Sequence, residues 1–428
     1  MKIDLAYGTT GLTVDLPEAR TTVVRPRPQR AHRDPMGALL GALRRPIGSA
    51  PLRDLATGRP NARVAISVCD LTRAQPRQLM LRAIFEVLEG AVRPENVTIL
   101  IATGTHRSNT PTELESMLGG DILSRYRVIN HVARDRSTLV DLGIMGNGVP
   151  VALNREWMAA DLRITTGFVE PHFFAGFSGG PKMVAPGLAG IETVLTLHDA
   201  RRIGHPKATW GVTEGNPVHD DVRAIAAATG VSFALDVTLN SGQEITSAFG
   251  GELFAMHRAA CAAAREVAMQ PVDRPFDVVI TSNSGYPLDQ NLYQLVKGMS
   301  AAAKVVRKDG LILCAGECRD GVPDHGSYAE ILRSRRSLGE LLEMIESPGY
   351  RVPDQWQVQV QAKVQRHARV MVRADGVTGD QLRAAHLTPA RDIQAEAVQA
   401  LEAAGPGATA CVLPEGPQTI PYLKHEQS

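Results

Sequence analysis

Residues 161–183 read DLRITTGFVEPHFFAGFSGGPKM, an apolar run that ends in an acid, a histidine and a glycine-rich turn. The run from Leu162 to Val169 has the composition of a buried β-strand. Glycines allow backbone N–H groups to approach a ligand closely, and successive N–H groups in such a turn form an anion-binding nest. The stretch therefore predicts a strand followed by a ligand-binding loop, with Lys182 at its end as a charge or a nucleophile.

Two known motifs nearly match the glycine-rich turn. The P-loop requires glycine before its lysine and serine or threonine after it, whereas Pro181 and Met183 stand at those positions. Residues 176–180 match the GxSxG motif of α/β-hydrolases, but the serine of that motif must lie directly at a strand end. Eight residues separate Val169 from Ser178, so a hydrolase remains an alternative that the context disfavours.

Length, charge and cysteine usage limit the class of protein. A chain of 428 residues favours two domains over one core. The 46 Lys and Arg nearly balance the 45 Asp and Glu, so net charge does not recruit nucleic acid or an anionic membrane. No apolar run reaches transmembrane length and no signal-peptide core is present, so we expect a cytoplasmic protein with no membrane partner. The five scattered cysteines predict buried free thiols rather than a zinc site.

The alternation of apolar runs with helical periodicity predicts an α/β fold of mostly parallel sheets flanked by helices. A Pro-containing stretch at residues 270–275 suggests a boundary between an N-terminal domain, 1–270, and a C-terminal domain, 276–428. We expect the active site in the cleft between them. The expected strands are 2–7, 12–16, 21–24, 63–69, 97–102, 162–169, 231–237, 244–249, 277–281, 310–314, 369–372 and 408–413; the expected helices are 36–43, 78–88, 254–268 and 290–303.

Polar clusters follow several of these strands directly, where open α/β sheets bind their ligands. His106 and His172 are each compatible with a structural role, but together they suit two general bases acting on one substrate carbon. Arg73 suits either a surface ion pair or a bidentate grip on a carboxylate. His198 shares a helical face with apolar residues, which by itself favours a core histidine. The Gln294 and Lys297 face suits either solvent or a ligand.

As a set, these motifs resemble the lactate racemase family of nickel-pincer enzymes. The shared features extend from Asp70 to Trp356, over most of the chain. They are Asp70-Leu-Thr-Arg73, Gly104-Thr-His106-Arg107, Glu170-Pro-His172 through Lys182, His198, Gly215-Asn216-Pro217, Ser282-Asn-Ser-Gly-Tyr-Pro287 with Gln294 and Lys297, and Asp354-Gln-Trp356.

The resemblance implies a nickel pincer nucleotide, pyridinium-3-thioamide-5-thiocarboxylic acid mononucleotide, which holds nickel between two sulfur-bearing arms. By this resemblance Lys182 would bind one arm covalently, and His198 would be a nickel ligand rather than a core histidine. A square-planar site with soft donors and imidazole suits Ni(II). The implied cofactor contacts are Asp70, Thr72, Lys182, Gly176, Ser178, Gly179 and Gly180, with the glycine loop around the phosphate.

The implied activity is that of an isomerase that inverts C2 of a small 2-hydroxy acid, lactate by default, through reversible hydride transfer. His106 and His172 would exchange the hydroxyl proton on the two faces of the substrate. The implied substrate contacts are Arg73, Tyr293, Gln294, Lys297 and Trp356. The expected partners are the substrate and the enzymes that synthesise the cofactor. A non-catalytic carrier of the nucleotide is the alternative, and the presence of both histidines argues against it.

Overall fold

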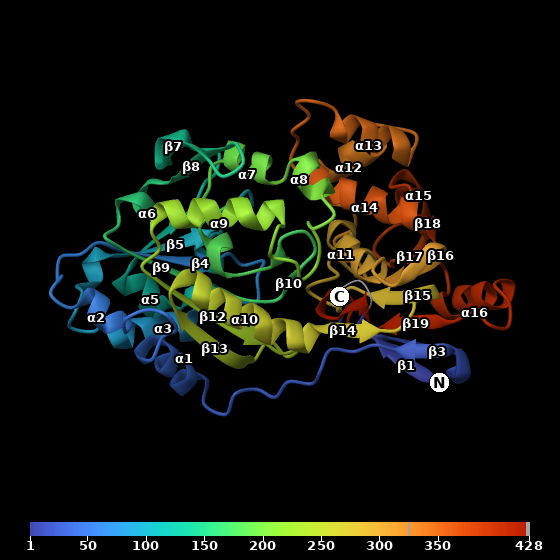
Figure 1. Ribbon diagram of the computed structural model, residues 1–428, viewed down its shortest axis with the longest axis horizontal. Coiled ribbons are helices and arrows are strands. Elements are labelled where there is room, and N and C mark those ends of the chain that lie inside the picture. The colour runs from blue at the N-terminus through green and yellow to red at the C-terminus, as the bar shows by residue number, and fades with distance from the viewer. Residues whose placement is uncertain (324–325, 425–428) are drawn as a thin grey trace. The chain divides into compact units, whose positions relative to one another are not determined.

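The computed structural model describes residues 1–323 and 326–424, which form two compact units (Figure 1). Unit 1 contains residues 1–27 and 199–206 and the chain from Glu266 onward, and unit 2 contains residues 28–198 and 207–265. Both units are built on a six-stranded sheet with helices against it. The predicted fold class, α/β with mostly parallel sheets flanked by helices, is confirmed.

The path of the chain differs from the two consecutive domains 1–270 and 276–428. The N-terminal strand β3 (Thr21–Val23) pairs in parallel with β19 (Ala410–Leu413), at the edge of the unit 1 sheet. The hairpin of β1 (Lys2–Leu5) and β2 (Leu12–Asp15) packs in the same core as that sheet. The sequence pattern identifies these strands but carries no information about which sheet they join.

The unit 2 sheet has the strand order β13-β12-β9-β4-β5-β6. All neighbouring strands are parallel except the antiparallel pair β12–β13. Every residue of β4 is buried, as expected for a central strand covered on both faces. The strands are β4 (Val64–Cys69), β5 (Val97–Ala102), β6 (Arg127–Asn130), β9 (Leu162–Phe168), β12 (Phe233–Leu239) and β13 (Ile245–Gly251).

Helices cover the two faces of this sheet (Figure 1). The helices α1 (Pro35–Arg44) and α3 (Arg77–Leu88) pack on one face and share a core with β4, β5 and β9. The helix α9 (Pro217–Thr229) lies on the other face, and α10 (Leu253–Ala268) follows β13. This arrangement follows from right-handed crossovers that run in opposite directions along the sheet.

The order of the unit 2 strands contains a topological switch. The chain passes from β4 to β5 and β6, then returns to β9 on the other side of β4 and continues to β12. The loops that follow β4 and β9 therefore diverge at the carboxyl edge of the sheet. A switch point of this kind is where open α/β sheets bind ligands.

The unit 1 sheet has the order β18-β17-β16-β15-β19-β3 and is parallel throughout. The helices α11 (Leu292–Ala302) and α14 (Gln355–His367) contribute to one core, and α16 (Ile393–Ala403) contributes to another. The helix α8 (Ala200–Gly204) docks on α14, where Gln359 Nε2 donates to the carbonyl of Ala200 over 2.9 Å. The strands are β15 (Phe276–Ser282), β16 (Val306–Ala315), β17 (Arg369–Arg373) and β18 (Thr388–Pro389).

The antiparallel hairpin of β7 (Leu139–Met145) and β8 (Val149–Asn154) was not expected from the sequence, because β7 has few buried residues to give a pattern. The remaining elements are α2 (Leu52–Ala56), α4 (Pro111–Leu118), α5 (Gly120–Arg125), α6 (Arg155–Ala159), β10 (Pro171–His172), β11 (Gly176–Phe177), α7 (Ile191–Leu197), β14 (Met269–Val272), α12 (Tyr328–Arg333), α13 (Leu338–Glu346), α15 (Gly379–Ala384) and β20 (Ile420–Leu423).

Two expectations from composition can be compared with the structure. All five cysteines are buried free thiols, as predicted. In residues 1–323 and 326–424, no helix combines the length and the apolar character needed to cross a bilayer.

Candidate active site

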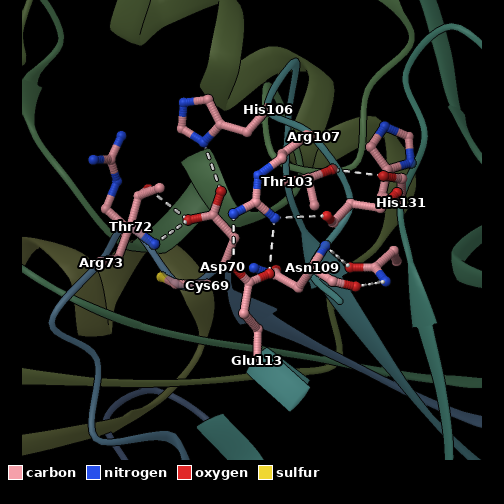
Figure 2. Close-up of polar contacts among 12 residues, drawn as sticks. Cys69, Asp70, Thr72, Arg73, Thr103, His106, Arg107, Asn109, Glu113 and His131 are labelled. Carbon is pink, nitrogen blue, oxygen red and sulfur yellow. Dashed lines mark hydrogen bonds and ion pairs between the residues drawn. The ribbon is translucent and has the colours of Figure 1, made fainter. Parts of the chain in front are cut away.

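The turn after β4 places a buried carboxylate against the loop after β5. Asp70 Oδ1 accepts hydrogen bonds from the backbone N–H of Thr72 at 3.1 Å and from its hydroxyl at 2.6 Å. Asp70 Oδ2 lies 2.6 Å from Nδ1 of His106 (Figure 2). The Asp70 side chain is 4% exposed and that of His106 is 47% exposed. The structure therefore brings together the first two predicted motifs as a carboxylate–histidine pair.

The charge of Asp70 fixes the tautomer of His106. Burial opposes ionisation of Asp70, but the hydrogen bond and charge of His106, with Arg73 and Thr72, outweigh it and lower the pKa of Asp70 to about 2. An ionised carboxylate only accepts hydrogen bonds, so His106 donates through Nδ1 and a neutral ring has its lone pair on Nε2. His106 can therefore act as a base through Nε2, which is the atom remote from Asp70.

Arg77, which belongs to no motif in the sequence, is bonded to backbone carbonyls of this turn from its buried side. Its guanidinium donates to the carbonyls of Cys69 at 2.7 Å and Arg73 at 2.6 Å, and to that of Asp70. Arg77 is 7% exposed, whereas Arg73 is exposed. The buried arginine shapes the turn and leaves the second arginine available for a ligand. A lone arginine at the start of a helix has no sequence signal that distinguishes it from a surface residue.

The loop after β9 returns on itself as the short antiparallel pair β10–β11, in which His172 is opposite Gly176. The Nδ1 atom of His172 accepts a long hydrogen bond, 3.3 Å, from the backbone N–H of Ala175. An accepting Nδ1 leaves the proton of a neutral ring on Nε2. His172 thus has the opposite tautomer to His106. The exposed Glu170 uses its backbone to bond Ser178.

The buried ring of Phe174 has three of the predicted residues around it. The His172 ring packs edge-on with its centroid at 4.5 Å, and the His198 ring does so at 5.2 Å. The Nζ of Lys182 lies 5.8 Å from the centre of the same ring. Asn216 fixes this position by donating from Nδ2 to the carbonyl of Phe174 over 2.9 Å. The imidazoles of His172 and His198 and the amine of Lys182 therefore all lie around the Phe174 ring.

His198 lies at the C-terminal end of α7, where its Nδ1 is 2.8 Å from the carbonyl oxygen of Val194. A carbonyl can only accept, so Nδ1 donates and the lone pair of the neutral ring is on Nε2. Metal-binding histidines commonly have this arrangement, with one nitrogen fixed by a carbonyl and the other available to a metal. In the part of the chain that the structure describes, no group of three or more His, Cys, Asp or Glu could hold a metal ion.

The glycine-rich loop does not form the predicted anion nest. The N–H of Ser178 donates to the carbonyl of Glu170 at 2.9 Å, and the N–H of Lys182 donates to that of Gly179 at 3.2 Å. The N–H of Gly180 donates to the carboxylate of Asp236 at 2.6 Å. These donors are used inside the protein, so the phosphate-binding role expected of Gly176, Ser178, Gly179 and Gly180 finds no support in the loop's backbone.

Two family models and several known proteins match most of the chain. Residues 7–211 match the lactate racemase N-terminal domain and residues 272–420 match the lactate racemase C-terminal domain. A lactate racemase from Thermoanaerobacterium thermosaccharolyticum is 34% identical over 396 residues, covering 91% of this chain and 92% of the relative. A lactate racemase from Lactiplantibacillus plantarum is 34% identical and covers 88% of each chain.

The chain belongs to the lactate racemase family. It is accordingly an isomerase of the racemase type. The solved lactate racemase apoprotein from T. thermosaccharolyticum superposes with a TM-score of 0.91 at 33% identity, over 98% of this chain and 100% of that one. A Thermotoga maritima protein, 20% identical with a TM-score of 0.64 over 84% of this chain and 93% of its own, shares the fold.

Ser178 has a structural role that does not suit a hydrolase. Its hydroxyl donates to the carbonyl of Phe168 at 2.9 Å and accepts from the N–H of Glu170 at 3.0 Å. The buried His257 contacts the backbone carbonyl of Ser178 at 2.9 Å rather than the hydroxyl. A serine nucleophile needs a base at its hydroxyl, and the contacts at Ser178 supply a backbone clamp instead.

The four predicted substrate residues of unit 1 also lie together. Tyr293, Gln294 and Lys297 are half-buried on α11, and Trp356 is buried on α14. Trp356 Nε1 donates to the hydroxyl of Tyr293 over 3.1 Å. This pair is formed within unit 1, and the part that these residues play in a lactate racemase family site stays a prediction.

Replacing Asp70 by Asn should lower the free energy of unfolding at pH 6, and protonation of Asp70 at low pH should have the same effect on the wild type. The pKa of Asp70 is lowered to about 2 in the fold, against about 3.9 in an unfolded chain. The contribution of the ionised carboxylate, about 2 kcal/mol, is therefore complete above pH ~4 and is lost as the pH falls toward 2. We expect wild type and Asp70→Asn to differ in free energy of unfolding at pH 6 and to converge toward pH 2, measured by urea titration. Asp121→Asn, at an exposed ion pair with Arg82, is the control. A gap for Asp70→Asn that is the same at both pH values would contradict the assignment.

Proposed function

We propose that the chain interconverts the enantiomers of a small 2-hydroxy acid, with lactate as the first substrate to test. The observation that carries the proposal is the gathering of His172, Lys182 and His198 around the Phe174 ring in a member of the lactate racemase family. A racemase needs groups that exchange a proton on both faces of the substrate. The neighbouring Asp70–His106 pair supplies a second such group.

We propose further that the nickel pincer nucleotide is the cofactor, bound covalently through Lys182. The donor chemistry fits this group, because a carbonyl holds Nδ1 of His198, which directs the Nε2 lone pair of a neutral ring outward, and imidazole is a ligand that suits Ni(II). When bound, the group supplies a metal-supported ring that reversibly accepts hydride. The half-buried position of Lys182 beside an aromatic face suits a tethered planar ring, which would stack where aromatic rings prefer to pack.

The proposed roles of the protein groups follow from their contacts. Arg73 is exposed beside the Asp70 turn and would bind the substrate carboxylate through its planar fork. His106, oriented by Asp70, would take the hydroxyl proton through Nε2, and His172 would act as the base for the other enantiomer in the tautomer that has its lone pair on Nε2. Tyr293, Gln294, Lys297 and Trp356 would contact substrate oxygens and wall the pocket. In place of the expected phosphate grip, we assign the glycine loop the role of carrying Lys182.

A non-catalytic carrier of the nucleotide remains the alternative from another class. A carrier needs Lys182 and His198 but has no use for an imidazole whose tautomer is fixed by a buried carboxylate. The Asp70–His106 pair, with one partner 4% exposed, costs desolvation free energy that a carrier gains nothing from. The pair thus favours the racemase.

Loss of either histidine should impair racemisation in both directions, because an enzyme cannot change the equilibrium between enantiomers. A general acid–base group contributes about 10²- to 10⁴-fold, so His106→Ala and His172→Ala should each reduce kcat/KM by about that factor. The measurement is chiral chromatography of D- and L-lactate, with a panel of other 2-hydroxy acids, using protein produced together with the cofactor-synthesising enzymes.

Ser178→Ala tests the hydrolase alternative, and esterase activity that disappears in this variant would support that alternative over the racemase.

The lysine and the second histidine should separate cofactor attachment from metal binding. Lys182→Ala should carry no covalent adduct in intact-mass spectra, whereas His198→Ala should keep the adduct and lose most of its nickel, measured by elemental analysis. The wild type produced without the cofactor-synthesising enzymes is the control and should be inactive and nickel-free. An adduct that maps to a different residue would refute the tether.

Arg73→Lys should impair substrate use although it keeps the positive charge, because lysine lacks the planar fork. A charge-assisted bidentate contact is worth about 1.5–3 kcal/mol, or about 10- to 150-fold in kcat/KM. The matched control is Arg107→Lys, since the guanidinium of Arg107 already pairs with the carboxylate of Glu113 (Figure 2). An Arg73→Lys enzyme with the kcat/KM of wild type would place the carboxylate site elsewhere.

A further inference from the structure

A layer of buried titratable side chains lies behind the glycine-rich loop, and the proposed reaction does not use it. Asp236 comes from β12 and is fully buried. His219 from α9 and His257 from α10 are 2% and 4% exposed. The two imidazole rings are stacked, with centroids 5.8 Å apart and an interplanar angle of 18°. We name these three residues the support cluster.

Two members of the support cluster bond the backbone of the segment that leads to Lys182. Asp236 Oδ2 accepts the N–H of Gly180 at 2.6 Å. His257 Nε2 is 2.9 Å from the carbonyl oxygen of Ser178, to which it donates. His219 stacks on the His257 ring and so packs behind that contact. The contacts thus hold the chain at Ser178 and Gly180 from one side.

The glycines of the loop are explained by this close approach. A Cβ atom on Gly179 would lie 2.6 Å from Asp236 Oδ2, and one on Gly180 would lie 2.5 Å from the His257 ring. Both glycines also have positive φ, +71° and +50°, which side chains other than glycine adopt at a cost. The two glycines therefore allow the loop to rest directly on the support cluster, in place of the anion contact that their pattern suggested.

The electrostatics of the support cluster favour uncharged imidazoles. Burial, together with the positive charges of Arg223 and Lys182, lowers the pKa of His257 to about 4. Burial, followed by the charges of His257, Arg223 and Lys182, lowers the pKa of His219 to about 3. Burial raises the pKa of Asp236 to about 7, opposed by the hydrogen bond from the N–H of Gly180. Both histidines respond to the charge of Lys182, so the cluster lies within electrostatic reach of the lysine amine.

Polar groups in this position cost more than apolar ones would. Within the described residues, Nδ1 of His219 has no hydrogen-bond partner although it is buried, and an unmet buried polar atom costs about 1–3 kcal/mol. Apolar side chains of similar volume would fill the same space without this cost. They would not, however, fix the backbone at Ser178 and Gly180.

We propose that Asp236, His219 and His257 are positioning residues that set the loop at residues 178–180, so that the Lys182 amine reaches the group it binds. The proposal rests on the proposed attachment at Lys182 and assigns the support cluster no contact with substrate. Its effect passes through the backbone, since Gly180 begins the 3₁₀ turn that contains Lys182. That turn is held at its other end by Ser67, whose hydroxyl donates to the carbonyl of Met183 at 2.9 Å.

The test compares volume-matched variants produced together with the cofactor-synthesising enzymes. His257→Phe and Asp236→Leu remove the backbone contacts, and we expect the covalent adduct at Lys182, measured by intact mass, to form about 10- to 100-fold more slowly, as for other outer-shell partners. His257→Gln retains an N–H donor and should restore most of the adduct formation. If His257→Phe does not fold, Asp236→Leu, which removes the contact to Gly180, decides in its place.

The matched control is Asp221→Leu. Asp221 is also a fully buried carboxylate of unit 2, and it accepts the N–H of Asn147 at 2.8 Å in a turn next to Gly146. This variant should form the Lys182 adduct as wild type does. Equal loss of the adduct in Asp221→Leu and the support-cluster variants would overturn the proposal, because general destabilisation would then explain it.

A second measurement is independent of the cofactor. In protein produced without it, acetic anhydride should acylate Lys182 at a rate that changes in His257→Phe and Asp236→Leu relative to the exposed Lys424, as determined by peptide mass mapping. Wild-type protein that never forms the adduct would refute the proposed function, and the acylation rates would still decide the positioning. Unchanged adduct formation and unchanged acylation in folded variants would overturn the positioning role.

Discussion

The return of the chain from β6 to β9, past β4, is the constraint on which the rest of the site depends. Parallel strands end at the same edge of a sheet, so the loops after β4, β5 and β9 start close together. Because the chain reverses its direction along the sheet between β4 and β9, the loops on either side diverge, as at the edge where open α/β sheets bind ligands. The topology alone brings Asp70, His106 and His172 to one edge of the sheet, independently of the contacts that their side chains make.

Hydrogen bonds from neighbouring groups then fix the orientation of the side chains at this edge. Asp70 is fixed by Thr72, and His106 is fixed by Asp70. His198 is fixed by a carbonyl of its own helix, and Phe174 by Asn216. For His106 and His198, a hydrogen bond of 2.6–2.8 Å at Nδ1 makes Nε2 the atom that the proposed chemistry would use. The site is therefore preorganised by neighbours that do not themselves react, as is usual for catalytic and metal-binding side chains.

The sequence predicted the strands with continuous apolar runs and the residues that follow them, because burial on both faces leaves a clear pattern. It did not predict that β3 joins the sheet of the C-terminal half, since edge pairing leaves no mark in a three-residue strand. Arg77 and the support cluster were also missed. A buried polar residue that bonds backbone has no periodicity and no partner motif, and its role becomes visible when β12, α9 and α10 converge on the loop.

The glycine-rich loop illustrates the same limit in a different way. Its glycines were correctly read as a site of close approach, but the approaching group was taken to be a ligand. In the structure the approaching groups are Asp236 and His257, from the protein side. A glycine pattern indicates that another group approaches the backbone closely, but it does not identify that group. The specific part of the motif is therefore the lysine that the loop carries.

The two catalytic candidates are of one residue type, and their different backbone surroundings give them complementary chemistry. His106 donates through Nδ1 to a carboxylate, so its Nε2 is basic, whereas His172 accepts at Nδ1 from Ala175 and its Nε2 carries a proton. This arrangement suits one direction of an inversion, with a base on one face and an acid on the other. A racemase must also run in reverse, which requires the protons to exchange afterwards. For the other enantiomer His172 would have to take the tautomer with its lone pair on Nε2, which gives up only the long 3.3 Å contact from the N–H of Ala175.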